Sequence, residues 1–560
     1  MAESERKVKM AEKEPSLNTT PAPQESSLRR WSFFFTYLLF FPLLLQLLFG
    51  AFSFSAEEWL NGLSGVIFRG ALCGIFIFSA LHLPRRAAPF LMGAVSVTAG
   101  IFNLLDIFLL VNFGSLFDYN IFQTARIAPK EEIRGFMQLF FMRVSTWVIL
   151  LLYPAAGIII FKLKKKKLLW GTLALFTAGV MFLFNVSARE SSSPLPSPAV
   201  RMKNFVHSWQ VTRRQLQMEK AFSKEITAEN SDPEALYILV IGESHSRRRS
   251  SLYGFPRETT PGLKKLYSQE KLFRFDNGVT PHVMTHLALP GLLTLAGSDG
   301  AHFTRYPSLP DIFRRAGFKV WYIYNQMPDK ESALPFLTAA KRADHFISLS
   351  NPRKEYDLQI LPEVEKIFRS SAQKKLLILH LRGNHWKYAD TFPEEMRHFS
   401  RTPGKSSKEN ILNEYDDSLR ALDHFLCKLI QKIEKQKCNA LLLYLADHGE
   451  SLYEEDDFVG HTDLFPTAAT AEIPLFLWLS DTFPRPELRK KITKSLNKPF
   501  LSSDLPHFFM ELAGIKTAVF APERSLINPL YKEMPRRVST RGKDYRSMKN
   551  RSTPPTSEQR

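Results

Sequence analysis

Five long apolar stretches in the first third of the sequence constrain this chain most. Each approaches the roughly 20 residues that a helix needs to cross a bilayer. They run approximately over residues 31–53, 63–83, 88–112, 144–163 and 168–186. The first stretch follows about 30 polar residues and is too long for the core of a signal peptide, so we expect a retained anchor. The sequence therefore predicts a polar segment at 1–30 and a five-helix transmembrane domain at 31–186.

Positive charge predicts how this domain is oriented. Basic clusters precede the first stretch, join the second to the third and join the fourth to the fifth: Arg29, Arg30, Arg85, Arg86 and Lys164 to Lys167. With five crossings all of these clusters lie on one side, and cationic loops stay in the cytoplasm. We therefore expect the amino terminus in the cytoplasm and the chain after about residue 187 on the outer side. The net charge of +19 suits an anionic membrane surface, and no nucleic-acid-binding motif accompanies it.

The remainder of the chain has the pattern of a globular α/β domain. Residues 187–230 are rich in serine, proline and polar residues and are expected to form a linker, whereas 231–530 alternate strand-length apolar runs with amphipathic stretches. The expected strands are 236–241, 319–324, 376–381, 440–446 and 473–479, and the expected helices include 308–316, 358–370 and 409–435. This alternation predicts an α/β sandwich with a mainly parallel sheet. The basic tail at 531–560 has the composition of a disordered segment.

Metal-capable side chains follow three of the expected strands. Glu243 follows the first run, His385 comes after 376–381, and Asp447 with His448 follows 440–446, while His461 lies on the next loop. Parallel strands present their carboxyl ends at one edge of a sheet, where ligand sites gather. Mixed carboxylate and imidazole donors suit Zn²⁺, with Mn²⁺ as the alternative.

The cysteines do not suit a metal site. The three cysteines, Cys73, Cys427 and Cys438, cannot supply a tetrahedral thiolate site outside the membrane. Whether Cys427 pairs with Cys438 stays open.

Several motifs resemble those of a known family. Residues 240–244 (VIGES) with 251–261 (SLYGFPRETTP) resemble the entry motif of the bacterial phosphoethanolamine transferases, in the alkaline-phosphatase/sulfatase superfamily. Residues 447–451 (DHGES) resemble their second metal motif. Residues 380–385 (HLRGNH) are most similar to the subgroup that modifies the lipopolysaccharide core. The resemblance extends over about residues 31–530 and includes the membrane anchor.

The resemblance also implies roles for individual residues. Glu243, Asp447, His448 and the nucleophile Thr285 would hold the catalytic zinc. His385 and His461 would bind a second metal or the substrate phosphate, and Asn325, Gln326 and Lys330 would contact the phosphoethanolamine group. Thr280 is an alternative nucleophile. His245, His282 and His286 are expected to be peripheral, and Arg247 to Arg249 are expected on a solvated face.

The activity implied is metal-dependent transfer of phosphoethanolamine from phosphatidylethanolamine to lipopolysaccharide, at a core sugar or phosphate, through a covalent threonine intermediate. The enzyme would reside in the bacterial inner membrane among membrane lipids, with its catalytic domain in the periplasm. The family members that modify lipid A carry a disulfide around the nucleophile, and this sequence lacks those cysteines. Alternatives are the same chemistry on lipid A or a periplasmic glucan, phosphoglycerol transfer, a hydrolase, or a non-catalytic membrane sensor.

Overall fold

The structure, a computed structural model, describes part of the chain. The described residues are 122, 205–210, 212–213 and 226–549, without 299, 301, 327–334, 350–355, 400–407, 455–458, 464–465 and 540–541. The chain divides into two compact units, and nearly all described residues belong to the second, which comprises 123–133 and 208–560. The five predicted membrane spans lie outside the described residues. Among the residues that are described, no helix is both long and apolar enough to cross a membrane.

A seven-stranded mixed sheet forms the centre of this unit. Its strands in spatial order are β3 (Leu272–Phe275), β11 (Leu475–Leu479), β8 (Ala440–Ala446), β2 (Ala235–Gly242), β7 (Lys374–His380), β5 (Lys319–Tyr324) and β6 (His345–Ser348). β11 runs antiparallel to both of its neighbours, β3 and β8, and the other pairs of strands in this sheet are parallel. The predicted α/β sandwich with a mainly parallel sheet is therefore confirmed.

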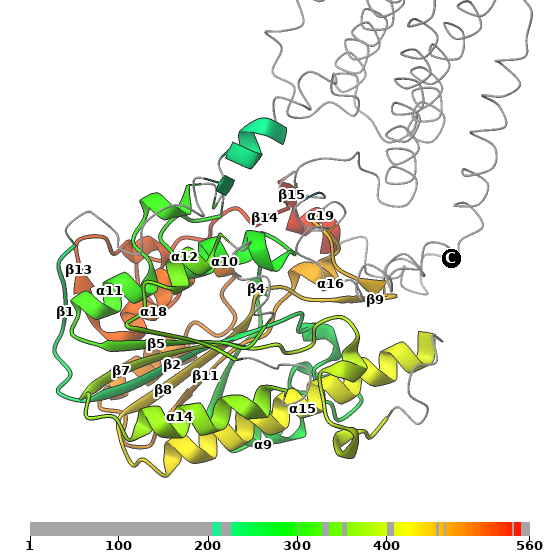
Figure 1. Cartoon of the computed structure of the whole chain (residues 1–560), viewed down its shortest axis with the longest axis horizontal. Coiled ribbons are helices and arrows are strands. Elements are labelled where there is room, and N and C mark those ends of the chain that lie inside the picture. The colour runs from blue at the N-terminus through cyan, green and yellow to red at the C-terminus, as the bar shows by residue number, and fades with distance from the viewer. Residues whose placement is uncertain are drawn as a thin grey trace, which may run out of the picture. The chain divides into compact units, whose positions relative to one another are not determined.

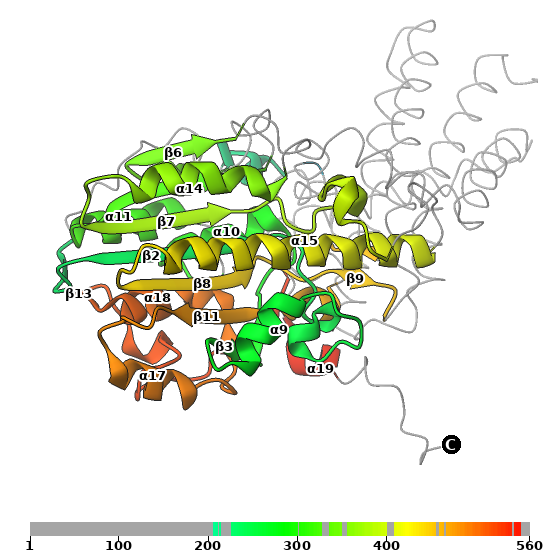
Figure 2. The ribbon, with the colours of Figure 1, turned by 90° about the horizontal axis from the view of Figure 1, so that it is seen from below.

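Helices cover both faces of the sheet (Figure 1). One face carries α10 (Thr285–Leu293), α11 (Leu309–Arg315), α12 (Leu337–Ala340), α16 (Ala468–Ala471) and α18 (Leu505–Ala513). The other carries α9 (Pro261–Ser268), α14 (Ile360–Phe368) and the long α15 (Lys408–Glu434), which Figure 2 shows in front of the strands. Because both faces are covered, the central strands are buried along their whole length and read in the sequence as unbroken apolar runs.

Alternation along β2 shows how the core is divided. Tyr237, Leu239 and Ile241 belong to one hydrophobic cluster, which also contains side chains of α10, α11 and α18. Successive side chains of a strand point to opposite faces, so the residues between them face the side of α15. The sheet is thereby packed on both faces, and the loops after its parallel strands share one edge.

Part of the tail that was predicted to be disordered is folded in the structure. Residues 537–538 and 543–544 pair as the antiparallel strands β14 (Arg537–Val538) and β15 (Lys543–Asp544), and α19 (Tyr545–Lys549) follows. Val538, Tyr545 and Met548 are buried. Apolar residues are so widely spaced in this basic segment that its composition alone concealed their packing.

Candidate metal and catalytic site

Glu243 is placed by the end of the central strand β2. Its side chain is 1% exposed. Gly383, in the loop after β7, approaches it so closely that an added Cβ would lie 2.9 Å from both the backbone nitrogen and the backbone oxygen of Glu243. Gly383 also has a φ of +51°, which favours glycine. A residue without a side chain is therefore needed here to let the two strand-end loops meet.

Asp447 and His448 arrive from the neighbouring strand β8. The backbone nitrogen of Asp447 donates to the carbonyl of Gly242, which holds this loop beside the end of β2. Both side chains are fully buried. Nδ1 of His448 lies 2.8 Å from the carbonyl oxygen of Gly449 and donates to it, since a carbonyl can only accept. Nε2 is thereby the ring nitrogen that faces Asp447 and Glu243, and a metal ion bound there would replace its proton.

Thr285 begins helix α10 and completes this group. Its Oγ1 lies 3.1 Å from Oε2 of Glu243 and 3.3 Å from Nε2 of His448. The amino terminus of a helix carries a partial positive charge, so an oxygen there is stabilised as it becomes anionic. The structure thus brings together the residue predicted to act as nucleophile and two of the predicted metal ligands.

The spacing of these atoms fits a tetrahedral metal site. Nε2 of His448 lies 3.4 Å from Oε1 of Glu243 and 3.5 Å from Oδ2 of Asp447, besides 3.3 Å from Oγ1 of Thr285. Zinc bonds of about 2.0–2.1 Å arranged as a tetrahedron separate neighbouring donor atoms by about 3.3 Å. Oδ2 of Asp447 is buried without a hydrogen-bond partner, as expected of an oxygen atom that binds a cation. All four residues therefore fit a zinc ion.

The electrostatics of the cluster also favour a cation. Burial, followed by the charge of Glu243, raises the pKa of Asp447 to about 7. Burial opposes ionisation of Glu243 as well, yet its hydrogen bond to His448 and the nearby imidazoles hold its pKa well below the usual range. Burial lowers the pKa of His448, but Asp447 and Glu243 outweigh it and raise that pKa to about 10. A divalent ion would let both buried carboxylates ionise together.

His461 lies against this cluster on a rigid support. Its ring centroid is 4.0 Å from that of His448. Its Nδ1 lies 2.6 Å from Oε2 of the buried Glu450, and Oε1 of Glu450 accepts a hydrogen bond from the hydroxyl of Tyr388. Within the described part of the chain, Glu243, His448 and His461 form a group whose donor atoms all lie within 4.8 Å of one another. His461 is thus placed to ligate a metal or to contact a substrate.

Comparison with known proteins identifies the fold. The sequence profile of the Sulfatase family matches residues 235–515, half of the chain. The chain belongs to the sulfatase family. Phosphoethanolamine transferase EptC of Escherichia coli (strain K12) is 32% identical to it over 320 residues, which are 55% of this chain and 55% of that relative. The chain therefore spans little more than half the length of this curated relative.

Solved structures place this sulfatase-family chain among similar folds. The C-terminal periplasmic domain of EcEptC from Escherichia coli, in complex with Zn, has a TM-score of 0.54 and 28% identity, and covers 59% of this chain and 98% of that domain. The integral membrane protein lipooligosaccharide phosphoethanolamine transferase A (EptA) from Neisseria meningitidis has a TM-score of 0.59 over 90% of this chain and 97% of its own, at 16% identity, which shows a shared fold alone. The resemblance to phosphoethanolamine transferases is confirmed.

Gln326 and Asn325 occupy different places although they are adjacent in the sequence. The amide nitrogen of Gln326 lies 2.9 Å from Oε2 of Glu243, so Gln326 supports a predicted metal ligand. Asn325 is fully buried and bonds to Asp357 and Gln359 instead. The structure thus does not bring the Asn325 side chain to the site.

Of the other two predicted substrate-binding residues, Lys330 and His385, the structure describes only His385. Lys330 lies outside the described residues. His385 is half-buried, and its Nδ1 lies 3.2 Å from the carbonyl oxygen of Trp386. It lies near enough to Glu243 to help lower the pKa of that carboxyl group.

The alternative nucleophile Thr280 is directed elsewhere. It is fully buried, and its hydroxyl donates to the carbonyl of His282, 2.9 Å away. Asp463 holds the same loop by accepting from the backbone nitrogen of Val283 at 2.9 Å and by contacting His282 at 3.3 Å. Thr285 is therefore the threonine that the fold presents to the candidate metal ligands.

Sequence reasoning missed the partners that support the site. Glu450 lies within the motif at residues 447–451, and neither Glu450 nor Tyr388 was assigned a role from the sequence. Asp463 gave no signal at all. Their roles depend on contacts between distant segments, such as the 62 residues that separate Tyr388 from Glu450.

The expectation that Arg247 to Arg249 lie on a solvated face is wrong. Arg247 and Arg248 pair with Glu472 at 3.1 and 3.0 Å, and Arg249 pairs with Asp416 at 2.7 Å. These arginines are only partly exposed because they connect the entry loop to buried carboxylates. The three cations therefore have a structural role.

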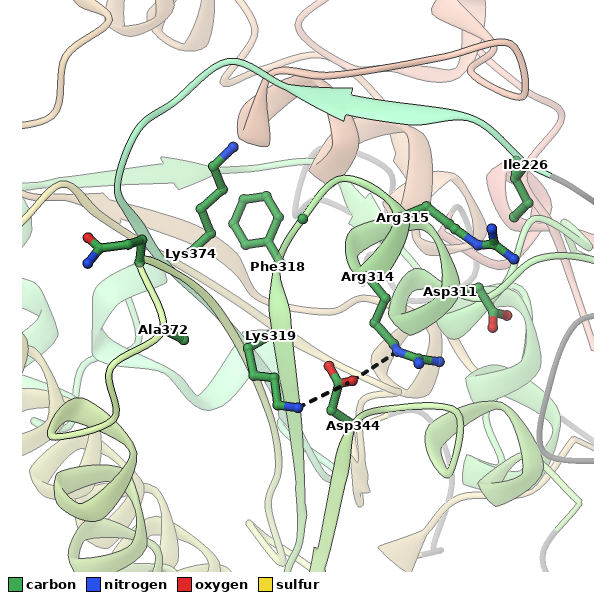
Figure 3. A pocket seen from close by; sticks show the side chains of 11 residues that line it. Ile226, Asp311, Arg314, Arg315, Phe318, Lys319, Asp344, Ala372 and Lys374 are labelled. Carbon is green, nitrogen blue, oxygen red and sulfur yellow. Dashed lines mark hydrogen bonds and ion pairs between the residues drawn. The ribbon is translucent and has the colours of Figure 1, made fainter.

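A separate cavity of about 650 Å³ lies away from the candidate site (Figure 3). It is lined at the amino ends of β5 and β7 by Lys319 and Lys374, whereas the candidate site lies at the carboxyl ends of these strands. Asp344 on its wall pairs with Arg314 at 3.1 Å and Lys319 at 3.7 Å. One carboxylate thus faces two cations here, so this wall keeps a net positive charge, at the opposite end of the strands from the candidate site.

Proposed function

We propose that this chain transfers phosphoethanolamine from phosphatidylethanolamine to lipopolysaccharide through a covalent intermediate on Thr285. The observation that carries the proposal is the meeting of Thr285 Oγ1 with donor atoms of Glu243 and His448 at 3.1 and 3.3 Å. The similarity to phosphoethanolamine transferase EptC supports the group that is transferred. A core sugar or phosphate is the proposed acceptor.

The first half-reaction begins at the threonine hydroxyl. Oγ1 of Thr285, which lies 3.1 Å from Oε2 of Glu243, loses its proton and attacks the phosphorus of the donor. The bond from Oγ1 to phosphorus forms while the bond from phosphorus to the glycerol oxygen breaks, and diacylglycerol leaves with one proton. A bound zinc ion supplies the charge that favours an alkoxide and offsets negative charge on the phosphoryl oxygens.

The second half-reaction reverses the roles of the oxygen atoms. An acceptor oxygen forms a bond to phosphorus, the bond to Thr285 breaks, and the acceptor's proton returns to the threonine. His385 and His461 would donate hydrogen bonds to the phosphoryl oxygens, and Lys330 and Gln326 would bind the transferred group. Two sequential transfers through one covalent intermediate predict ping-pong kinetics.

The proposed setting follows from the unequal distribution of apolar residues and charge. Residues 1–30 would lie in the cytoplasm, 31–186 would form five membrane helices, 187–230 would be a periplasmic linker and 231–530 the catalytic domain. The reported integral membrane nature of the similar EptA fold supports this arrangement. The donor would then be drawn from the outer leaflet of the inner membrane.

Covalent labelling tests the chemistry directly. The full chain in detergent is incubated with phosphatidylethanolamine and no acceptor, and its intact mass is measured. We expect a gain of about 123 Da, the phosphoethanolamine unit, located on Thr285 by fragmentation. Thr280→Ala should retain the adduct and Thr285→Ala should lose it. An adduct that persists in Thr285→Ala excludes the proposed nucleophile, and a different mass indicates another group such as phosphoglycerol.

The acceptor requires a separate experiment. Lipopolysaccharide from a strain that lacks this gene is compared with the parent strain by mass spectrometry. Core fragments should lose about 123 Da. An unchanged core with altered lipid A, or with altered periplasmic glucan, would move the proposal to that acceptor.

Sulfate-ester hydrolysis is not favoured although the family is named for sulfatases. That chemistry would need a modified cysteine or serine at the nucleophile position, and the three cysteines lie at 73, 427 and 438. Cys427 and Cys438 are both free in the structure. Thr285 instead offers an unmodified hydroxyl. A non-catalytic sensor would not need a nucleophile beside metal ligands, so loss of lipopolysaccharide modification in Thr285→Ala would argue against it.

A further inference from the structure

The last folded segment of the chain lies beyond the family match, which ends at residue 515. We name residues 536–539 and 542–549, which include β14, β15 and α19, the C-terminal clasp. Its apolar side chains are not exposed: Val538 is fully buried, Tyr545 is 2% exposed and Met548 is 7% exposed. Burial of three large side chains in a short segment indicates a specific docking position.

The clasp docks on the loop that leads to the nucleophile. Val538 and Tyr545 share a hydrophobic cluster with Val279 and Val283. The backbone nitrogen of Ser539 donates to the carbonyl oxygen of Pro281, 2.8 Å away. These contacts fall within six residues of Thr285, on the segment that enters α10.

A buried polar anchor fixes the other end of the clasp. The hydroxyl of Tyr545 donates to Oε1 of Glu472 at 2.7 Å. Glu472 is 5% exposed and also pairs with Arg247 and Arg248. Its backbone forms an isolated antiparallel bridge with Val279. The same glutamate therefore connects the clasp to the start of the nucleophile loop.

The loop is held from a second direction by Asp463. This carboxylate accepts from the backbone nitrogen of Val283 at 2.9 Å, while Ser539 donates to Pro281 two residues earlier. A loop fixed at two positions only two residues apart, by elements about 75 residues apart in sequence, has little freedom to move. The position of Thr285 relative to the metal ligands depends on this loop.

We propose that the C-terminal clasp is a positioning element that holds the Thr285 loop in register with Glu243 and His448. Its catalytic consequence rests on the proposed function, since it requires Thr285 to be the nucleophile. A misplacement of about 1 Å at a reacting atom can reduce a rate by about 10²-fold. Loss of the clasp therefore affects the rate of phosphoryl transfer more than donor binding.

Two truncations of the full chain test this inference. One ends after Pro535 and lacks the clasp; the matched control ends after Lys549 and lacks only residues 550–560. We expect the first to form the Thr285 adduct at least about tenfold more slowly at saturating phosphatidylethanolamine, with the half-saturating concentration unchanged. The control should react at the rate of the full chain. Equal rates in both truncations would overturn the proposal.

Hydrogen exchange provides a readout that does not depend on activity. In the chain ending after Pro535, amides of residues 279–287 should exchange faster, whereas those of strand β2 should stay protected. Uniformly faster exchange would mean that the clasp stabilises the whole domain, and unchanged exchange would mean that it does not hold the loop. Either result contradicts the proposal. If the intact chain forms no adduct but exchange changes as expected, the proposed function is wrong, whereas the inference that the C-terminal clasp holds the Thr285 loop is supported.

A milder variant guards against misfolding of the truncated chain. Tyr545→Phe removes only the hydroxyl that donates to Glu472. It should keep the melting temperature within a few degrees and still raise exchange at residues 279–287 and slow adduct formation, though less than truncation. Unchanged exchange and rate in a normally folded Tyr545→Phe would show that the polar anchor has no positioning role.

Discussion

Nδ1 of His461 lies 2.6 Å from Oε2 of Glu450, a carboxylate that is fully buried. The second oxygen of Glu450 accepts from the hydroxyl of Tyr388. Glu450 thus has both oxygens engaged and fixes one ring orientation of His461. This leaves Nε2 to face the cluster of Glu243 and His448, where it can contact a metal ion or a phosphoryl oxygen.

Replacing Glu450 by glutamine tests the importance of this orientation. The amide preserves shape but removes the charge that fixes His461, so we expect the rate of transfer to fall by about 10- to 100-fold with little change in donor KM. Tyr388→Phe should have a smaller effect in the same direction. Glu363→Gln, at an exposed i,i+3 pair with Lys366, is the matched control and should leave the rate unchanged. A Glu450→Gln enzyme of normal activity would contradict this role.

Gly383→Ala tests the close approach of the two strand-end loops. An added methyl group would lie 2.9 Å from the backbone of Glu243, and the φ of +51° adds strain. We expect a loss of about 1–3 kcal/mol in unfolding free energy and a large loss of zinc binding and activity. Gly317→Ala separates these effects because Gly317 has a φ of +86° with nothing within 4 Å of the added Cβ. It should lose stability yet retain zinc and activity. Equal activity losses in both variants would mean that contact with Glu243 does not matter.

His507 gives a pH dependence that is remote from the site. Burial and the charge of Arg524 lower its pKa from 6.5 to about 4. The imidazole of His507 is therefore protonated near pH 6.5 in the unfolded chain but only near pH 4 in the folded chain. The free energy of unfolding falls as the pH drops from about 6.5 to about 4, because the unfolded chain binds the proton first. The contribution is up to about 3 kcal/mol. Thermal denaturation should show a smaller acid-induced loss of stability in His507→Gln than in the natural chain. A parallel pH dependence in both proteins would contradict the effect of burial.

Removal of the metal should destabilise the domain as well as inactivate it. Without a cation, the carboxylates of Glu243 and Asp447 are buried beside one another, and burial with Glu243's charge raises the pKa of Asp447 to about 7. We expect chelation to lower the melting temperature and to stop adduct formation, with both restored by zinc. Glu243→Ala should lose bound zinc in elemental analysis, whereas Glu363→Ala should keep it. Normal zinc content in Glu243→Ala would refute the assignment of this ligand.

The sequence predicted the central strands well because burial on both faces leaves an unmistakable pattern. Strands 319–324 and 440–446 were predicted with the bounds that the structure has, and 236–241 differs by one residue at each end. The two outer strands of the sheet, β3 (LFRF) and β6 (HFIS), were both missed, since each has four residues, of which two in β3 and all in β6 are exposed or half-buried. Edge strands give weaker signals because only part of their surface is covered.

The candidate site was predictable to the extent that strand ends determine it. Glu243, Asp447 and His448 follow directly from β2 and β8, so the topology alone brings them together. Asn325 also follows a strand, but its side chain turns to Asp357. Which way a loop residue points depends on long-range hydrogen bonds that local pattern does not contain. The docking of Tyr545 on Glu472 was hidden for the same reason.

An anomalous diffraction map of the full chain, collected at the zinc absorption edge, would show directly whether Thr285 shares a metal ion with Glu243, Asp447 and His448. We expect one peak within about 2.0–2.2 Å of Oγ1 of Thr285, Nε2 of His448 and carboxylate oxygens of Glu243 and Asp447. A peak held by His461 while Thr285 lies out of bonding distance, or the absence of any peak at these residues in zinc-loaded protein, would contradict it.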